Sequence, residues 1–197
     1  LAEHGVNYDL FSRALDEQLP VPADIAVLPR PLVGYIGTLQ DWFDQELIEF
    51  LAHSNPDWTF VLLGKPTVDL ARITRLPNVH FLGRRPYEDL PAYCRQFSVG
   101  LIPYILNAHM AYQNPLPRFE YLAAGAPGVA TAIPELIDHG DLCRVARTYE
   151  EFEAATADAI RRNAATDRRA RSDAMRSETW VARVEGICRH VMRIKSR

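Results

Sequence analysis

The sequence lacks several features that mark specialised classes of protein. Its three cysteines, Cys94, Cys143 and Cys188, are scattered and show no C-x-x-C spacing. We therefore expect a reducing compartment, no disulfide framework and no metal ion or cofactor. No apolar run approaches the roughly 18 residues that span a membrane. The amino-terminal residues show neither a methionine nor a targeting pattern, so we expect a piece of a longer protein.

The net charge is small, but the charged residues are unevenly distributed. The 197 residues carry a formal net charge of −3 and are 48% hydrophobic, as in ordinary globular proteins. Residues 161–197, however, hold 11 Lys and Arg against 4 Asp and Glu. Such a tail can bind nucleic acid or an anionic membrane, or it can be a solvated helical face or a docking surface. Because aromatic and basic residues do not interleave, we favour the second interpretation and expect no nucleic-acid partner.

Apolar segments alternate with helix-forming ones along the chain. A helix is expected after the first strand with Asp41 as its N-cap, and a short one near 67–75. Another is expected from Pro115 to Ala124, stopped by Gly125. Strands are predicted at 32–37, 58–63, 79–82, 98–103, 128–131 and 142–146.

This alternation predicts an α/β fold with a Rossmann-like, doubly wound, mainly parallel six-stranded sheet that has helices on both faces. Residues 32–150 form this domain. Residues 1–31, rich in proline, are expected to be a connector with one short helix near 11–18. Residues 151–197 are expected to form helices. Ligands of such sheets bind beyond the carboxyl ends of the strands, so the loops after the first, third and fourth strands are the candidates.

The loop after the first strand offers Gly37 and Thr38. A glycine there allows a ligand to approach the backbone, and the next helix can favour an anion. The G-x-G-x-x-G pattern is absent, and Asp41 and Asp44 would repel a phosphate. The loop is therefore either a ligand loop or a tight turn.

The third strand ends in Gly83, Arg84 and Arg85. These arginines can face the base and phosphates of a nucleotide, or they can be surface residues. For either arginine alone the surface interpretation is favoured.

The segment 114–131 contains a short helix, a glycine stop and a buried strand. Glu120 lies near the middle of that otherwise apolar helix. A carboxylate there can accept hydrogen bonds from two neighbouring ribose hydroxyls. A solvent-facing or salt-bridged glutamate fits the spacing equally well.

Segment 114–131 resembles the Glu-containing donor-site motif of the retaining, GT-B-fold group-one glycosyltransferases, which reads approximately N-P-L-K-x-F-E-Y-L-A-A-G-K-P-V-V-A-T. Residues 4–11, 78–93 and 99–104 resemble further landmarks of that family in the same order. The resemblance runs from about residue 4 to residue 136. It identifies the chain as similar to the carboxyl-terminal, donor-nucleotide-binding lobe of such an enzyme.

The resemblance implies a nucleotide-diphosphate sugar as ligand, with UDP or GDP as the nucleotide. It implies that Glu120 binds the ribose, that Gly83 and Arg84 flank the base, and that Gly37 and Thr38 lie under the diphosphate. The acceptor site and the catalytic histidine region belong to the first lobe, so no catalytic residue is expected in this chain.

Three departures from the family pattern affect the predicted site. A carboxylate expected eight positions before Glu120 is Tyr112, and the lysine of the motif is Pro117. The basic pair often found in the first loop is replaced by residues 40–44. With Asn114 as N-cap and Pro115 first in the helix, two of the first three helical N–H groups would be missing. Arg118 and Arg84 are the cations left to contact a diphosphate.

The function implied is sugar transfer to an acceptor in cell-surface glycan or glycolipid synthesis, with the isolated lobe inactive. The expected place is the cytoplasm, at the inner face of the membrane, with peripheral membrane contact through the full-length enzyme. The alternative is a glycosyltransferase-like module with a degenerate donor site and a non-catalytic binding or structural role. An apolar stripe on the last helix is expected to pack partly on the sheet domain and partly on the first lobe. Its members are Trp180, Val184, Ile187 and Val191.

Overall fold

The computed structural model describes residues 4–107, 114–137, 143–163 and 165–195. Within them it has one six-stranded sheet of order β3-β2-β1-β4-β5-β6, and all neighbouring strands are parallel. The predicted α/β, Rossmann-like fold class is thus confirmed. The strands are β1 (Leu32–Ile36), β2 (Thr59–Leu63), β3 (Val79–Gly83), β4 (Val99–Ile102), β5 (Gly128–Thr131) and β6 (Cys143–Ala146).

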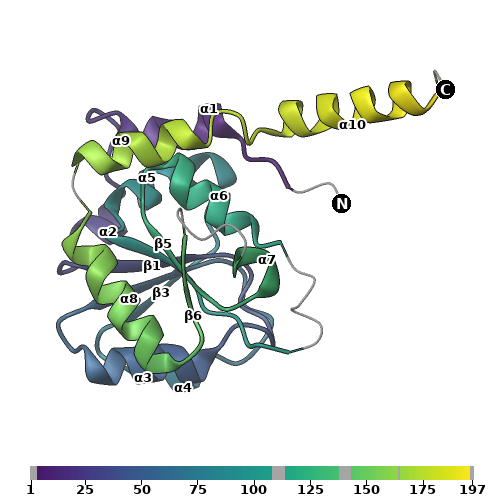
Figure 1. Ribbon diagram of the computed structural model, residues 1–197. Coiled ribbons are helices and arrows are strands. Elements are labelled where there is room, and N and C mark those ends of the chain that lie inside the picture. The colour runs from purple at the N-terminus through teal and green to yellow at the C-terminus, as the bar shows by residue number, and fades with distance from the viewer. Residues whose placement is uncertain (1–3, 108–113, 138–142, 164, 196–197) are drawn as a thin grey trace.

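Helices connect the strands and cover both faces of the sheet (Figure 1). On one face α3 packs on α4 and α8, and α8 contacts β5 and β6. On the other, α6 contacts β4, β5, α1 and α9. The helices are α1 (Tyr8–Phe11), η1 (Ser12–Leu15), α2 (Ala23–Ala26), α3 (Gln45–Ser54), α4 (Ala71–Thr74), η2 (Tyr87–Asp89), α5 (Leu90–Gln96), α6 (Leu116–Ala123), α7 (Pro134–Ile137), α8 (Tyr149–Arg161), α9 (Ala165–Ala174) and α10 (Trp180–Lys195).

The strand order reverses between β1 and β4, because the chain proceeds from β1 outward to β3 and then returns to the other side of β1. Ladder pairing of these two strands is limited to Val33 with Val99 and Gly34 with Gly100. Beyond it the hydroxyl of Tyr121 accepts the Ile36 N–H at 2.8 Å and donates to the Leu101 carbonyl at 3.3 Å. The side chain of Tyr121 therefore bridges the two strands where a ligand site of this fold is expected.

Two predicted helix starts are wrong. The N-cap of α3 is Asp44, whose carboxylate accepts the Leu47 N–H at 2.9 Å, instead of Asp41. The start is delayed because the Asp44 amide is bound to the Pro103 carbonyl at the end of β4, at 2.8 Å. Helix α6 has Pro115 as its N-cap, instead of Asn114, and begins at Leu116.

The later start of α6 changes how many backbone N–H donors are present in its first turn. Pro117 lies at the second helical position, so one of the first three helical N–H groups is missing, instead of two. The N–H of the third, Arg118, bonds the Pro115 carbonyl at 3.3 Å. The predicted loss of two donors at this helix end is therefore wrong.

The amino-terminal segment also contains more structure than expected. The proline-rich stretch was predicted to lack helix beyond about residue 18, yet α2 follows directly after Pro22. Pro22 is the N-cap of α2 with φ of −59°, a value that the proline ring fixes. Ile25 of α2 is fully buried, which explains why four residues suffice.

Helix α10 extends away from the sheet domain in the view of Figure 1. The side chains of its predicted stripe are between 43% and 56% exposed, so the expectation that part of the stripe packs on the sheet domain is wrong. Trp180 contacts His4 edge-on, with ring centroids 5.6 Å apart. Among the described residues, no helix has the length and apolar content to cross a membrane.

Candidate functional site

A cavity of about 360 Å³ opens at the reversal point between β1 and β4. Its walls come from the loop after β1, the segment after β4, the start of α5 with the preceding η2, and the first half of α6 with the residues before it. This is the place at which doubly wound sheets bind ligands. Its lining residues are Ile36, Gly37, Thr38, Trp42, Tyr87, Leu90, Tyr104, Asn114, Pro115, Leu116, Pro117 and Glu120.

Glu120 enters this cavity because α6 lies close against the sheet. The adjacent Tyr121 is fully buried, and its ring occupies the space that a side chain at Gly100 would need. A Cβ atom at Gly100 would lie 2.4 Å from that ring. Glycine on β4 therefore sets the approach of α6, and the hydroxyl of Tyr121 ties the helix to β1 and β4.

Glu120 is a buried acid, only 4% exposed. Its Oε1 accepts a hydrogen bond from the Tyr87 hydroxyl at 3.0 Å. Burial raises the pKa of Glu120 to about 7, and the Tyr87 hydrogen bond opposes that rise. A carboxyl with such a pKa exchanges its proton near neutral pH and resembles the acids found in functional sites.

Backbone contacts hold Gly37 and Thr38 at the cavity wall. The Gly37 N–H bonds the Leu63 carbonyl at 3.0 Å, and the Tyr35 hydroxyl donates to the Thr38 carbonyl at 2.9 Å. Gly64, after β2, lies so close that a Cβ atom there would be 1.7 Å from the Gly37 oxygen. The loop after β1 is thus a fixed ligand-facing edge as well as a tight turn.

The cavity presents aromatic rings and oxygen acceptors but little positive charge. Among the described lining residues, Trp42, Tyr87 and Tyr104 supply rings, and none is Lys or Arg. Among the described residues, the buried Oδ1 of Asn114 has no hydrogen-bond partner, which leaves an acceptor available to a ligand. Nor do the described residues gather three metal-ligating side chains of the His, Cys, Asp or Glu type. These features suit a ligand that carries hydroxyls and flat rings.

Gly83 and Arg84 lie outside the described wall of the cavity. Gly83 has φ of +73° at the end of β3, a conformation that favours glycine. The side chain of Arg84 is exposed. Its neighbour Arg85 instead binds Asp24 at 2.7 Å and the Tyr93 hydroxyl at 2.9 Å, so the second arginine of the pair fastens α2 to α5.

Arg118 is also absent from the described wall, although it precedes Glu120 by two positions. It is 3% exposed, and its guanidinium lies 4.3 Å from the centre of the Phe119 ring. Its charge opposes the effect of burial, which raises the pKa of the Cys143 thiol on β6 to about 12. The side chain thus lies near Cys143 of β6.

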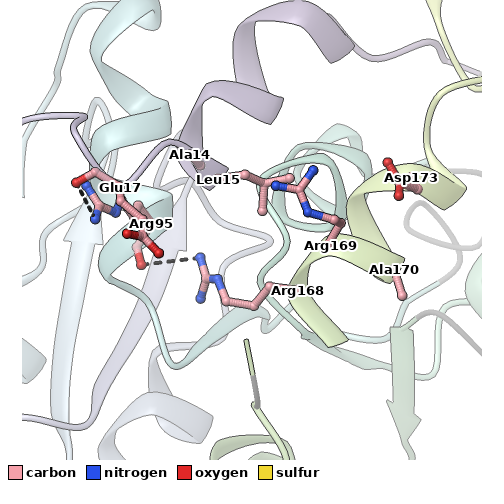
Figure 2. Close-up of a pocket in the computed structure, with 8 residues that line it drawn as sticks. All are labelled: Ala14, Leu15, Glu17, Arg95, Arg168, Arg169, Ala170 and Asp173. Carbon is pink, nitrogen blue, oxygen red and sulfur yellow. Dashed lines mark hydrogen bonds between the residues drawn. The ribbon is translucent and has the colours of Figure 1, made fainter. Parts of the chain in front are cut away.

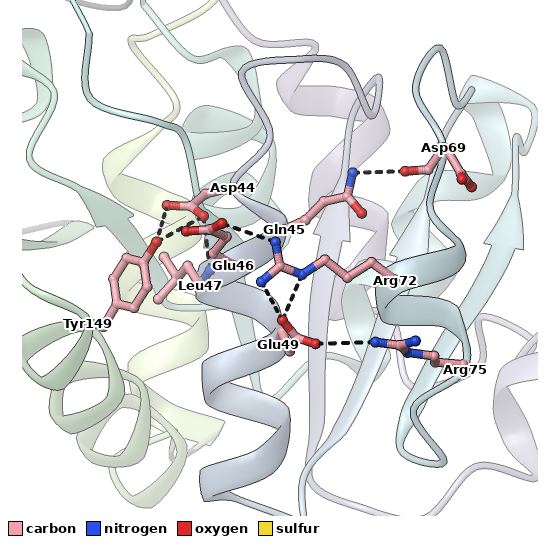
Figure 3. A network of polar contacts seen from close by, with 9 residues as sticks. All are labelled: Asp44, Gln45, Glu46, Leu47, Glu49, Asp69, Arg72, Arg75 and Tyr149. Atoms are coloured by element: carbon pink, nitrogen blue, oxygen red, sulfur yellow. Dashed lines mark hydrogen bonds and ion pairs between the residues drawn. The ribbon is translucent and has the colours of Figure 1, made fainter.

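The acidic residues of the loop after β1 face elsewhere. Asp41 and Asp44 line a separate cavity of about 310 Å³. The Asp44 carboxylate caps α3 and accepts the Tyr149 hydroxyl at 3.0 Å (Figure 3). Further along that network Glu49 pairs with Arg72 at 2.6 Å. Asp44 does not line the Glu120 cavity, so the expected repulsion of a phosphate by Asp44 does not act there.

A larger cavity of about 790 Å³ lies at the opposite, amino-terminal edge of the sheet, where Arg95, Arg168 and Arg169 line it (Figure 2). Arg168 donates to the carbonyl oxygens of Arg95, Phe97 and Ala124 at 3.3–3.4 Å. Arg95 donates to those of Leu19 and Glu17. Arg168 therefore binds the ends of α5 and α6, and Arg95 binds the amino-terminal segment.

The sequence prediction missed the aromatic members of the site. Tyr87 lies four residues after the glycine that ends β3, and Tyr104 lies two residues after the end of β4. Their positions at the carboxyl ends of strands were visible in the sequence. Their convergence on Glu120 was not, because it depends on the strand order.

Comparison with known proteins agrees with this architecture. The family described as "Glycosyl transferases group 1" matches residues 30–165. "Putative teichuronic acid biosynthesis glycosyltransferase TuaH" of Bacillus subtilis (strain 168) is 33% identical over 136 residues, which is 67% of this chain and 34% of TuaH.

Two solved structures share the fold over nearly the whole chain. Anabaena Alr3699/HepE, in complex with UDP and glucose, has a TM-score of 0.70 and 17% identity and covers 95% of this chain and 55% of its own. Sucrose-phosphate synthase from Thermosynechococcus elongatus has a TM-score of 0.72 and 21% identity. This match covers 100% of this chain and 52% of the synthase chain. The chain thus spans about a third of TuaH and about half of these structures. With more than half of its length matched by the family, the chain belongs to the group 1 glycosyl transferases.

Proposed function

We propose that this chain is the donor-binding half of an enzyme that transfers a sugar from a nucleotide-diphosphate sugar to an acceptor. The observation that carries the proposal is the buried Glu120 carboxylate, which faces a cavity at the reversal point of the sheet. Carboxylate oxygens accept hydrogen bonds from the two hydroxyls of a ribose. Gly37 and Thr38 lie in the same wall and offer backbone groups to the diphosphate.

The nucleotide proposed is UDP or GDP, and the process is the synthesis of a cell-surface glycan or glycolipid at the inner face of the membrane. The presence of UDP in the Alr3699/HepE structure supports the nucleotide class. The name of TuaH, which refers to teichuronic acid biosynthesis, supports the process. Peripheral membrane contact would then belong to the whole enzyme.

A second lobe is part of this proposal, and the lobe described here would be inactive alone. The absence of Lys and Arg from the described cavity wall requires that positive charge for the diphosphate comes from elsewhere. The exposed stripe of α10 offers an apolar surface of the kind that binds another domain. Val6 pairs with Thr179 next to α10, so residues 1–31 and 151–197 would meet at the junction of the lobes.

The test is a titration of the chain with UDP, GDP and their glucose conjugates, followed by calorimetry and thermal unfolding. A ligand that binds the folded state raises its stability by about 2.7 kcal/mol at a hundred times its dissociation constant. Glu120→Gln should weaken binding, whereas Glu88→Gln, an exposed glutamate on η2, should not. Equal affinity in all three proteins would refute the assignment of Glu120.

The second candidate function is a non-catalytic module with a degenerate donor site. It is favoured by one specific observation, the lack of a cation in the described cavity wall. It predicts that no nucleotide diphosphate binds, either to this chain or to the complete protein. Binding to the complete protein alone would favour the enzyme, with the first lobe supplying the missing cations.

A further inference from the structure

Tyr87 lies between the Glu120 carboxylate and the amino-terminal segment. Its hydroxyl donates to Oε1 of Glu120 at 3.0 Å. Its ring packs edge-on against Phe11 of α1, with centroids 5.5 Å apart and the planes at 69°. Phe11 is fully buried, whereas Tyr87 is 40% exposed and lines the cavity. The ring is thus fixed on one side and reaches the ligand space on the other.

No cation faces Glu120 among the groups packed around it in the described structure. The titratable neighbours that interact with its charge are Tyr87 on η2, Cys94 on α5, Tyr104 after β4 and Tyr121 on α6. All four are neutral at pH 7, because burial raises their pKa values. Among the described side chains, that of Tyr87 donates a hydrogen bond to this carboxylate through its hydroxyl.

We propose that Tyr87 is a positioning residue for nucleotide binding, whose hydroxyl holds Oε1 of Glu120 and leaves Oε2 directed at the ribose hydroxyls. The proposal rests on the proposed function and adds a residue to it. A hydrogen bond to a carboxylate is stronger than one to its protonated form, so the contact also favours the ionised acid. Tyr87 therefore controls both the direction and the charge of the group that receives the ribose.

This double role has a signature in the pH dependence of binding. Burial raises the pKa of Glu120 to about 7, and the Tyr87 hydrogen bond opposes that rise. Removal of the hydroxyl leaves burial unopposed, so the pKa of Glu120 rises further. Ribose binding by the carboxylate should then weaken at neutral pH and recover at alkaline pH.

The experiment compares the 197-residue chain with Tyr87→Phe, which keeps the ring and its contact with Phe11. Tyr149→Phe is the matched control, because it removes a hydroxyl bonded to another carboxylate, Asp44, outside this cavity. UDP affinity is measured by calorimetry from pH 6 to pH 9. The titration of the Glu120 carboxyl is followed by carbon-13 NMR without nucleotide.

For Tyr87→Phe we expect the Glu120 midpoint to rise by about one pH unit and UDP affinity at pH 7 to fall by up to tenfold. At pH 9, where the carboxyl is ionised in both proteins, the affinity of Tyr87→Phe should recover in part, and the loss that remains reports the direction that the hydroxyl gives to the carboxylate. Tyr149→Phe should match the parent chain at every pH. An unchanged midpoint, or an unchanged UDP affinity at pH 7, in a folded Tyr87→Phe protein would overturn the role of Tyr87. If neither the parent chain nor the complete protein binds a nucleotide diphosphate at any pH, the proposed function itself fails.

Discussion

The two edges of the sheet differ in how their buried or half-buried charges are partnered. At the amino-terminal edge, Arg168 is braced by three backbone carbonyl oxygens, and Arg95 by two. At the carboxyl-terminal edge, Glu120 receives one hydrogen bond from a described side chain and faces no described cation. A charge whose partners are all within the fold stabilises the fold, whereas a charge left short of partners is a candidate for ligand binding.

Cavity size alone would favour the edge opposite the proposed site. The cavity beside Arg168 is about 790 Å³ and the one beside Glu120 about 360 Å³. Yet Arg168 in the larger cavity is already bonded to carbonyl oxygens at the ends of α5 and α6, where the helix dipole favours a cation. Variants at the two edges therefore separate stability from binding.

The largest expected effect belongs to Arg168→Ala. The substitution leaves the carbonyl groups of Arg95, Phe97 and Ala124 without their donor, so the free energy of unfolding should fall by about 3 kcal/mol. Nucleotide affinity at a temperature where the protein stays folded should not change. Urea denaturation and a UDP titration measure the two quantities.

Arg169→Ala is the matched control at the same edge. Arg169 lines the same cavity but is exposed. Its loss should change the free energy of unfolding by less than about 0.5 kcal/mol. If both arginine variants lower nucleotide affinity, the division between the two edges is wrong.

The next effect is the pH dependence of stability produced by Glu120. Its pKa is about 7 in the folded protein and lies near 4.5 when the acid is unperturbed. Between these values the folded state binds more protons than the unfolded state, so its stability falls as pH rises through this window. From pH 5 to pH 8 this contribution amounts to about 2–3 kcal/mol.

Glu120→Gln should remove that contribution, and urea denaturation at pH 5 and pH 8 measures it. The variant should therefore gain stability relative to the parent chain at pH 8. Glu88→Gln, which changes an exposed glutamate nearby, should keep the pH dependence of the parent. An unaltered dependence in Glu120→Gln would mean that the acid is solvated in solution.

A third effect concerns the bridge between β1 and β4. Tyr121→Phe removes the acceptor of the Ile36 N–H and the donor to the Leu101 carbonyl, both buried. Because these two buried backbone groups lose their partner, the free energy of unfolding should fall by about 2 kcal/mol. Because the same hydroxyl ties α6 to the cavity wall, UDP affinity should fall as well. A stability loss with unchanged affinity would show that Glu120 is positioned independently of this bridge.

Much of the fold was predictable because its signals are local. Strands rich in Val, Ile and Leu, and glycines such as Gly125 at helix ends, are read directly from neighbouring residues. The same holds for the candidate acid, since Glu120 interrupts an apolar helix. The family resemblance then gave its proposed role.

The remainder depended on contacts between distant residues. Asp44 displaces Asp41 as N-cap because its amide bonds Pro103, 59 positions away in the sequence. Tyr87 joins Glu120 through a hydrogen bond across 33 positions. Arg118 turns toward Phe119 and β6, although its position beside Glu120 suggested a place at the ligand. No local pattern carries this information.

The smallest expected effect concerns α10, whose stripe was predicted from spacing while its packing was not. Ile187→Ser combined with Val191→Ser changes side chains that are 47% and 43% exposed. In this chain the free energy of unfolding should change by less than about 0.5 kcal/mol, because little buried apolar area is lost. In a longer protein that carries the proposed first lobe, the same pair should lower the unfolding midpoint, since the stripe would then be covered. Thermal unfolding of both forms makes the comparison. A marked loss of stability in the 197-residue chain would mean that α10 folds back onto the sheet domain in solution, whereas no loss in the longer protein would remove the stripe from the proposed junction of the lobes.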